Sequence, residues 1–387
     1  MHEIQQADVI VIGAGIAGAS LAYELAAICR VLLLERESQP GYHTTGRSAA
    51  LFTETYGNAV MRALTRASKA FLAEPPAGFA SSPLLAPRGT LLVARDEQLP
   101  ALQRAHEECS ALVDNLRWCS PAEVRALVPC FAPGQVAAGL LEPDAMDIDV
   151  HALHHGFLRG LRARHGTLVC NAEVRALGRY RQDWRVQTAA GEFAAPLLVN
   201  AAGAWADEIA RLAGAAGIGL VPKRRTAITF DPPAGTAIEH WPAVIDIDED
   251  WYFKPDAGRI LASPADETPS PPCDAQPDEY DVAVLVDRLT RVTTLQVPRI
   301  HARWAGLRSF VADKTIVAGF DAKVDGFFWL AAQGGYGIQT APAAARAAAT
   351  LVRGEAIPAD LADLAVDAAA LSPGRLAAPA GARPGAG

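Results

Sequence analysis

The stretch VIGAGIAG constrains the fold more than any other part of the chain, because its glycines follow a GxGxxG pattern at Gly13, Gly15 and Gly18. In this pattern the first glycine permits a tight turn and the second lets the backbone approach a pyrophosphate. The third glycine lets the following helix pack closely on the preceding strand. A helix N-terminus at this point also offers N–H groups and a partial positive charge to an anion.

The residues around this turn predict a βαβ unit. An apolar run of strand length (7–12) precedes the glycines, residues 17–28 have helical spacing, and a second apolar run ends at Glu35. Strands joined in this way lie parallel in one sheet. A carboxylate at the end of the second strand is placed to accept the hydroxyls of a ribose. The sequence therefore predicts a dinucleotide-binding site, although the pattern does not distinguish NAD from FAD.

A second glycine-rich turn lies more than three hundred residues later. The apolar run 327–331 leads into Gly334-Gly335-Tyr336-Gly337, and an alanine-rich helix follows. Several glycines beside apolar residues cost conformational entropy without adding packing area. We therefore expect this loop to bring its backbone close to a ligand.

Composition limits the possible partners and the compartment. A chain of 387 residues predicts two domains, and its net charge of −8 argues against binding nucleic acid. The richest basic run, Lys223-Arg224-Arg225, suits a small anion, and strand alternation places Lys223 and Arg225 on one face and Arg224 on the other. The six cysteines form no CxxC pair, which favours free thiols in a reducing compartment.

Two further features have plain explanations. The uncharged stretch 9–23 is too short to span a membrane, is interrupted by glycines and follows no basic residue, so we expect a cytoplasmic protein without a targeting or transmembrane segment. His151, His154 and His155 have the spacing of metal ligands on a helix, but no second ligand cluster is near them in the sequence. We expect no metal site.

The pattern along the chain changes in the middle. Helical spacing at 60–73, 101–113, 120–128 and 149–166 gives way to strands within 173–205, and short alternating strands with proline-rich turns fill 218–300. Buried strands and the alanine-rich helix then return. The sequence predicts an α/β domain, interrupted by an antiparallel insert.

Four motifs in this order resemble the family of FAD-dependent D-amino acid oxidases and dehydrogenases. They are GYHTTGRSAAL (41–51), LVNAAGAW (198–205), WAGLRSFVAD (304–313) and AAQGGYGIQT (331–340). The resemblance extends to about residue 375 and, within the family, is greatest to bacterial D-arginine dehydrogenases. It implies a discontinuous Rossmann-like FAD-binding domain with an inserted antiparallel α+β substrate domain. The implied bounds are 1–80, 148–208 and 305–377 for the first and 81–147 and 209–304 for the second. The composition of residues 378–387 predicts a disordered tail.

The resemblance implies contacts to FAD from several separate segments. At the ADP end they are Gly13, Ala14, Gly15, Ile16, Ala17, Gly18, Glu35 and Arg36, with Val174 at the adenine. Thr45, Gly46, Arg47, Ser48 and Ala50 resemble the segment along the flavin ring, and Ala202, Gly203 and Trp205 the segment near the ribityl chain. The second glycine loop reaches the far end of the flavin with Gly334, Gly335, Tyr336, Gly337, Ile338, Gln339 and Thr340. Because no cysteine or histidine lies in a motif for covalent attachment, we expect non-covalent FAD.

The implied reaction is transfer of a hydride from the α-carbon of a D-amino acid to flavin N5. Water then hydrolyses the imine to a 2-oxo acid and ammonia. The resemblance assigns the substrate carboxylate to Arg308 and Arg225, closure of the pocket to Tyr56 and Tyr252, and the substrate amine to the carbonyl of Gly335. Arginine suits the first task because its guanidinium pairs two oxygens at once. For Arg224 we expect a surface ion pair.

Two positions depart from the D-arginine dehydrogenase pattern. Leu51 stands where those enzymes have a histidine, and Thr90 aligns with the glutamate that faces the guanidinium end of their substrate. Without that carboxylate a buried substrate cation has no partner, so we expect neutral or hydrophobic D-amino acids to be preferred.

Other functions stay open. The same clamp could serve an oxidase or dehydrogenase of glycine, sarcosine or a 2-hydroxy acid, and a non-catalytic flavin-binding subunit is a further alternative. The resemblance favours a quinone or another acceptor over oxygen.

Overall fold

The first glycine turn joins a strand to a helix, as predicted. In the computed structural model, which describes residues 4–376, β2 (Val9–Ile12) leads through the turn into α1 (Ile16–Leu25). The chain returns in β3 (Val31–Leu34), which pairs parallel with β2. All eight residues of the two strands are buried, as expected for a sheet that is covered on both faces.

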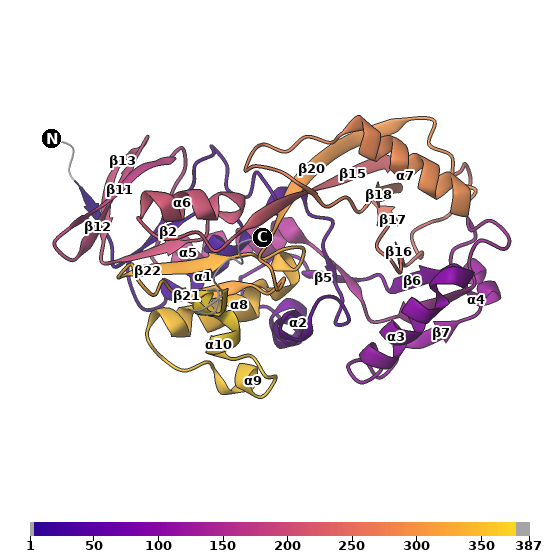
Figure 1. The fold of residues 1–387 in the computed structure, drawn as a ribbon, viewed down its shortest axis with the longest axis horizontal. Coiled ribbons are helices and arrows are strands. Elements are labelled where there is room, and N and C mark those ends of the chain that lie inside the picture. The colour runs from indigo at the N-terminus through magenta and orange to yellow at the C-terminus, as the bar shows by residue number, and fades with distance from the viewer. Residues whose placement is uncertain (1–3, 377–387) are drawn as a thin grey trace, which may run out of the picture.

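This βαβ unit begins a mixed sheet (Figure 1). In the described part of the chain its strands are, in order, β10 (Thr167–Val169), β3, β2, β14 (Leu197–Asn200), β22 (Phe327–Ala331) and β21 (Val317–Phe320). The strands run parallel except β21, which is antiparallel to β22. This sheet is the Rossmann-like core that the sequence predicted.

Alternate residues of β2 face two different layers. Val9 and Val11 pack in one core with several helices, among them α1, α5 (Val150–Ala163) and α8 (Gly337–Val352). Ile10 and Ile12 pack in another core on the opposite face. The elements of that second layer are β1 (Gln5–Gln6), β13 (Gly191–Ala195), β12 (Asp183–Thr188), β11 (Val174–Tyr180) and α6 (Ala206–Leu212).

A second large sheet forms the other lobe, with its own core. Within residues 4–376 it is made of β19 (Thr268–Pro269), β15 (Val221–Phe230), β18 (Arg259–Ser263), β17 (Tyr252–Asp256), β16 (Ala243–Asp246), β6 (Thr90–Ala94), β8 (Ala138–Glu142) and β7 (Arg117–Cys119), with β20 (Ile300–Phe310) along β15. Its pairs are antiparallel, as predicted for this region, except that β16 and β6 run parallel. Figure 1 shows β15 and β20 extending from the first lobe into the second.

The remaining elements cover these sheets or join them. A small sheet between the lobes contains β4 (Leu51–Phe52), β9 (Met146–Ile148) and β5 (Leu85–Pro87). The other helices are α2 (Ala59–Ala73), α3 (Leu99–Cys109), α4 (Pro121–Leu127), α7 (Glu279–Val292), α9 (Ala359–Ala362) and α10 (Ala368–Leu371). The expected disordered tail, 378–387, lies outside the described residues.

The helix α7 (Glu279–Val292) was not predicted. The sequence suggested only short strands in the region 218–300, but α7 occupies fourteen of these residues. Asp278 caps its N-terminus, and Val282, Leu285, Leu289 and Val292 bury one face at helical spacing. The signal was present in the sequence, and the proline-rich turns on either side obscured it.

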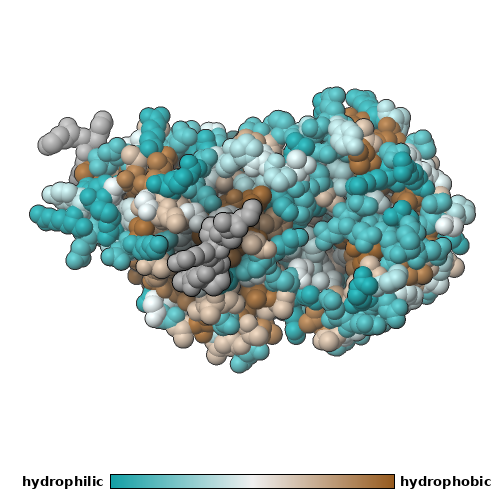
Figure 2. All heavy atoms as spheres, in the orientation of Figure 1, coloured by the Kyte–Doolittle hydropathy of each residue, from teal (hydrophilic) through white to brown (hydrophobic). Residues whose placement is uncertain are grey.

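The face of the molecule shown in Figure 2 is largely hydrophilic, with apolar residues scattered over it. In the described part of the chain, no helix has both the length and the apolar character needed to cross a bilayer.

The third glycine of the first motif serves packing. A Cβ atom at Gly18 would lie 1.9 Å from the carbonyl oxygen of Gly13, so the turn and the helix approach each other too closely for any side chain. Gly13 itself has a φ of +99°, which a glycine adopts without strain.

Replacing Gly18 with alanine should therefore lower the free energy of unfolding by about 3 kcal/mol, because the backbone of the turn must shift. Urea unfolding measures this change. Gly178→Ala in β11 is the matched control, since a Cβ there meets no described atom within 4 Å. Equal stability of the two variants would contradict this account of the turn.

Candidate active site

A cavity of about 680 Å³ lies between the two lobes. Its wall includes the residues that follow the carboxyl ends of β2, β3, β14 and β22, together with residues of β15, β20, β6 and β16. The carboxyl ends of parallel strands are where α/β sheets bind ligands. The two glycine turns border this same cavity, although they lie far apart in the sequence.

Glu35 connects the first glycine turn to the end of β3. Its carboxylate accepts hydrogen bonds from the backbone N–H of Ala14 at 2.9 Å and of Glu37 at 3.0 Å. Burial raises the pKa of Glu35, while these hydrogen bonds oppose the rise. The side chain also faces the cavity, so its remaining lone pairs can accept hydroxyl groups of a ligand.

Aromatic and charged side chains line the adjoining end of the cavity. The guanidinium of Arg36 lies 4.9 Å from the ring centroid of Trp205 and 3.1 Å from the carboxylate of Glu173. The ring of His43 lies 4.7 Å from that of Trp205. Together with Val174, these residues form a wall with flat surfaces, which suits a planar base.

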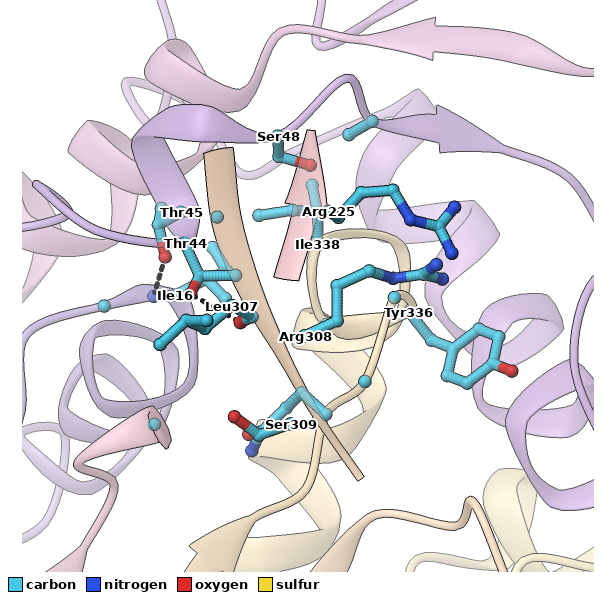
Figure 3. Close-up of a pocket in the computed structure, with 18 of the residues that line it drawn as sticks. Ile16, Thr44, Thr45, Ser48, Arg225, Leu307, Arg308, Ser309, Tyr336 and Ile338 are labelled. Atoms are coloured by element: carbon cyan, nitrogen blue, oxygen red, sulfur yellow. Dashed lines mark hydrogen bonds between the residues drawn. The ribbon is translucent and has the colours of Figure 1, made fainter. Parts of the chain in front are cut away.

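The segment that follows β3 is fastened to both lobes. The hydroxyl of Thr45 accepts a hydrogen bond from the backbone N–H of Ile16 at 2.9 Å (Figure 3). The hydroxyl of Thr44 donates to the carbonyl of Leu307, and Arg47 donates to the carbonyls of Ala275 and Ala305. The charged end of Arg47 thus fixes the position of the segment.

Arg225 and Arg308 come from neighbouring strands, β15 and β20. In the register Lys223 is opposite Arg308, so Arg225 is its diagonal neighbour on the same face of the sheet. Figure 3 shows both guanidinium groups directed into the same space, near Tyr336. Only 12% of each side chain is exposed. This geometry can bind an anion from two sides.

Hydrogen bonds to neighbouring residues hold the guanidinium groups of Arg225 and Arg308 in place, but they do not use every nitrogen atom. Nε of Arg225 donates to the carbonyl of Asp266 at 3.0 Å, and Nη2 of Arg308 donates to the hydroxyl of Tyr56. Among the described residues, the buried Nη1 of Arg308 has no hydrogen-bond partner. Burial disfavours the charge of Arg308, but its pKa is raised above the usual range by Tyr56, Tyr252 and Glu249. A ligand oxygen would complete this group.

The second glycine loop lies directly against Arg308. A Cβ atom at Gly335 would lie 1.6 Å from Nη2 of Arg308, so no side chain fits there. The rings of Tyr56 and Tyr336 approach each other to 4.8 Å between centroids. Tyr252 faces the cavity, whereas its neighbours Trp251 and Phe253 belong to the core of the second lobe. The face of β17 that carries Tyr252 is therefore the one that meets the cavity.

The cavity thus brings together most residues that the sequence singled out. Its wall contains Tyr56, Arg225, Tyr252, Arg308 and Gly335. From the predicted cofactor set it contains Gly13, Gly15, Ile16, Ala17, Glu35, Arg36, Thr45, Arg47, Ser48, Ala50, Val174, Ala202, Gly203, Trp205, Gly334, Tyr336, Gly337, Ile338 and Gln339.

Four residues of the predicted cofactor set are not in the cavity wall. Ala14 is buried between Glu35 and His154, and Gly18 packs against Gly13. The N–H of Gly46 donates to the carbonyl of Gly41, and the hydroxyl of Thr340 donates to the backbone carbonyl of Tyr336. These residues shape the wall from behind.

Sequence reasoning missed other polar residues of the wall. Oγ of Ser309 and Nε2 of Gln333 are buried and, within residues 4–376, have no hydrogen-bond partner. Ser309 directly follows Arg308, and Gln333 directly precedes Gly334. This adjacency to motif residues was the signal in the sequence that could have identified them. Together with Nη1 of Arg308 they leave buried donors unsatisfied in a cavity between two glycine turns. Such groups fit a long, polar, acceptor-rich ligand such as FAD.

The two departures from the family pattern also lie in the wall. Leu51 and Thr90 both line the cavity, and Thr90 is only 4% exposed. The apolar side chains of Leu92, Ile245 and Ile247 continue this part of the wall. Asp246 is acidic, but its carboxylate already accepts hydrogen bonds from Gln98 and from two backbone N–H groups.

The histidines of α5 are arranged differently from a metal site. His154 points inward, where its Nε2 lies 2.8 Å from the carbonyl oxygen of Ala14, while His151 is exposed. In the described part of the chain, no three His, Cys, Asp or Glu side chains are grouped to hold a metal. The six cysteines, all in that part, are free. The ion pair expected for Arg224 is present, to Asp281 at 2.7 Å.

Comparison with known proteins gives a consistent assignment. The family model described as "DAO: FAD dependent oxidoreductase" matches residues 8–351. L-2-hydroxyglutarate dehydrogenase of Escherichia coli (strain UMN026) is 25% identical over 60% of this chain, and the match spans 56% of that protein. FAD-dependent oxidoreductase domain-containing protein 1 of Bos taurus is 25% identical over 90% of this chain and 81% of its own length.

A solved structure shares the fold. Glycine oxidase from Geobacillus kaustophilus superposes with a TM-score of 0.79 at 21% identity, covering 91% of this chain and 95% of that one. The α/β fold with a Rossmann-like sheet, predicted from the sequence, is therefore confirmed.

We expect the buried His154 to make the stability of the fold depend on pH. Burial lowers the pKa of His154 to about 4, although the Ala14 carbonyl opposes the shift. A histidine with a depressed pKa in the folded state stabilises the fold above its unfolded pKa, near 6.5, and loses this contribution as the pH falls. Between about pH 7.5 and pH 5 the loss should be about 2 kcal/mol.

Urea unfolding of the unmodified protein and of His154→Gln over this pH range tests the expectation. Glutamine can still donate a hydrogen bond to the Ala14 carbonyl but does not titrate. On lowering the pH, the free energy of unfolding of His154→Gln should therefore fall by about 2 kcal/mol less than that of the unmodified protein. His151→Gln, at an exposed position of the same helix, is the control. Identical pH dependence of the unmodified protein and His154→Gln would contradict the assignment.

Proposed function

Because the chain belongs to the DAO family of FAD-dependent oxidoreductases, we propose that it oxidises neutral or hydrophobic D-amino acids. The product is the 2-imino acid, which water hydrolyses to a 2-oxo acid and ammonia. The observation that carries this proposal is the pair Arg225 and Arg308, directed from adjacent strands into one cavity beside the second glycine loop.

The residues of the cavity fit FAD, which when bound supplies the acceptor for a hydride. Glu35 and the first glycine turn would hold the ADP end, and the second glycine loop would hold the other end. The partial positive charge at the N-terminus of α8 favours negative charge in that region. We propose that FAD binds without a covalent bond, which release of the flavin on acid precipitation would verify.

Arg308 and Arg225 would bind the substrate carboxylate. Nη1 of Arg308 gains the partner that it lacks among the described residues, and the hydroxyl of Tyr56 adjoins the same guanidinium. Gly335 lies directly against the Arg308 guanidinium, and we propose that its carbonyl accepts a hydrogen bond from the substrate amine. Holding the acid and the amine together orients the α-carbon, and such positioning lowers the barrier without a strong base.

The wall formed by Leu51, Thr90, Leu92 and Ile245 supports a neutral or hydrophobic side chain. A cation brought against these four side chains would find no carboxylate among them, and burying an unpaired charge is costly. For this reason we propose that the chain differs in preference from the D-arginine dehydrogenases that its motifs resemble. We propose a quinone or a similar acceptor for the electrons.

A 2-hydroxy acid, glycine or sarcosine is the second candidate substrate, since a relative is named L-2-hydroxyglutarate dehydrogenase and a similar structure is a glycine oxidase. The two arginines would bind all these acids alike. A flavin-binding subunit without catalysis is less well supported, because the arginines, the two tyrosines and the Gly335 loop are all present.

Anaerobic mixing of the FAD-loaded protein with a panel of acids tests the proposal. We expect D-leucine, D-methionine and D-phenylalanine to bleach the flavin absorbance at least tenfold more efficiently than D-arginine. L-amino acids, glycine, sarcosine and 2-hydroxyglutarate complete the panel, and repetition in air detects peroxide. A clear preference for D-arginine, or for a hydroxy acid, would overturn the assignment.

Arg308→Lys tests the clamp, because lysine keeps the charge but cannot bind a carboxylate through two parallel hydrogen bonds. The kcat/KM for D-leucine should fall about a hundredfold, equivalent to roughly 3 kcal/mol. Arg224→Lys is the matched control, since Arg224 lies on the opposite face and pairs with Asp281. Equal losses in the two variants would argue against a specific role for Arg308.

A further inference from the structure

Glu142, at the end of β8, is a buried carboxylate whose contacts reach toward the cavity. It is 4% exposed. Its Oε2 accepts hydrogen bonds from the hydroxyls of Thr53 and Thr55, both at 2.7 Å, and its Oε1 accepts one from the backbone N–H of Glu54 at 2.9 Å. One side chain of the second lobe thus binds three successive residues of a single loop.

That loop carries Tyr56. The hydroxyl of Tyr56 accepts a hydrogen bond from Arg308, and Thr53 and Thr55 themselves line the cavity. At the far end of the loop Gly57 has a φ of +94°, and a Cβ there would lie 2.9 Å from the ring of Tyr336. Tyr56 therefore directly follows three residues that Glu142 binds, and its ring lies 4.8 Å from that of Tyr336 between centroids.

The same loop contacts the helix that follows the second glycine turn. The backbone N–H of Thr53 donates to Oε1 of Gln339 at 3.2 Å, and Nε2 of Gln339 donates to the hydroxyl of Thr65. Gln339 lies in α8, in the first lobe, whereas Glu142 lies in the sheet of the second lobe. The loop is thereby attached to both lobes through residue 53.

We propose that Glu142 is a positioning residue, which holds the 53–56 loop so that the hydroxyl of Tyr56 meets Arg308 and completes the carboxylate site. The inference rests on the proposed function in one respect, that an acid binds between Tyr56 and Arg308. Burial raises the pKa of Glu142, and the three hydrogen bonds oppose this rise because they favour the ionised carboxylate, to which hydrogen bonds are stronger than to a neutral group. A loop without such an anchor would not hold the tyrosine hydroxyl in one position.

The test compares four single variants of the FAD-loaded protein. Glu142→Gln removes the charge at constant shape, and Thr55→Val removes one donor with little change of volume. Thr55→Ser restores that donor, and Glu54→Gln alters a side chain of the same loop that instead pairs with Lys69. FAD content and thermal midpoint show whether each variant is folded, and Thr55→Val provides the milder change if Glu142→Gln is unstable.

Binding and chemistry are separated by anaerobic stopped-flow reduction with D-leucine. For Glu142→Gln and Thr55→Val we expect the Kd to rise at least tenfold while the limiting rate of flavin reduction changes less than threefold. Thr55→Ser and Glu54→Gln should stay within about threefold of the unmodified protein in Kd. An unchanged Kd in Glu142→Gln and Thr55→Val would overturn the proposal.

A double-mutant cycle shows whether Glu142 acts through Tyr56. In a Tyr56→Phe background, Glu142→Gln should raise the Kd less than twofold further, because the hydroxyl that it positions is already gone. A purely structural role would give the full tenfold rise in both backgrounds, and that result would contradict the inference.

Titration with benzoate, followed by the flavin absorbance, separates this inference from the proposed function. Benzoate offers a carboxylate but has no α-hydrogen to lose. If D-amino acids fail to reduce the flavin but benzoate binding still depends on Glu142 and Tyr56, the proposed function fails and the inference stands. If D-amino acids reduce the flavin but benzoate binds Glu142→Gln normally, or does not bind the unmodified protein, the inference fails.

Discussion

The antiparallel pairing of β15 with β20 is the constraint on which the candidate site depends. The two strands pair along nearly their whole length and connect the two lobes, with Lys223 opposite Arg308 and Arg225 opposite Gly306. This register puts both arginines on the face that meets the cavity. A shift of one residue would turn one guanidinium to the opposite face and destroy the pair. A Cβ atom at Gly306 would lie 3.6 Å from Cβ of Arg47, so this strand packs against the segment that follows β3.

The charges around this pair explain why it can bind an acid. Among the described residues, Glu267 is within 4 Å of Lys223, Arg225 and Arg308, so a single carboxylate faces three cations. Arg224, on the other face, meets three aspartates within the same distance. Arg225 and Arg308 are little exposed to water, and in such surroundings the attraction of an anion is stronger than in bulk solvent.

Sequence patterns predicted the features that depend on neighbouring residues. The glycine spacing gave the first turn, the alternation of Lys223 and Arg225 gave their shared face, and the motif around Arg308 gave the cavity wall. Contacts between distant residues left no such pattern: Glu142 binds Thr53 across 89 positions, and His154 binds Ala14 across 140. Tertiary packing alone creates these pairs. The helix α7 differs, because its apolar spacing was readable, and its proline-rich flanks misled the prediction.

The central claim is that two glycine turns from opposite ends of the chain hold one flavin beside a pair of arginines. A crystal structure of the protein with FAD and a small carboxylate that cannot be oxidised tests it most directly. The account predicts a single FAD extending from Glu35 to the Gly335 loop, with the carboxylate between Arg225 and Arg308. A flavin bound elsewhere, or a carboxylate that contacts neither guanidinium, would contradict the account.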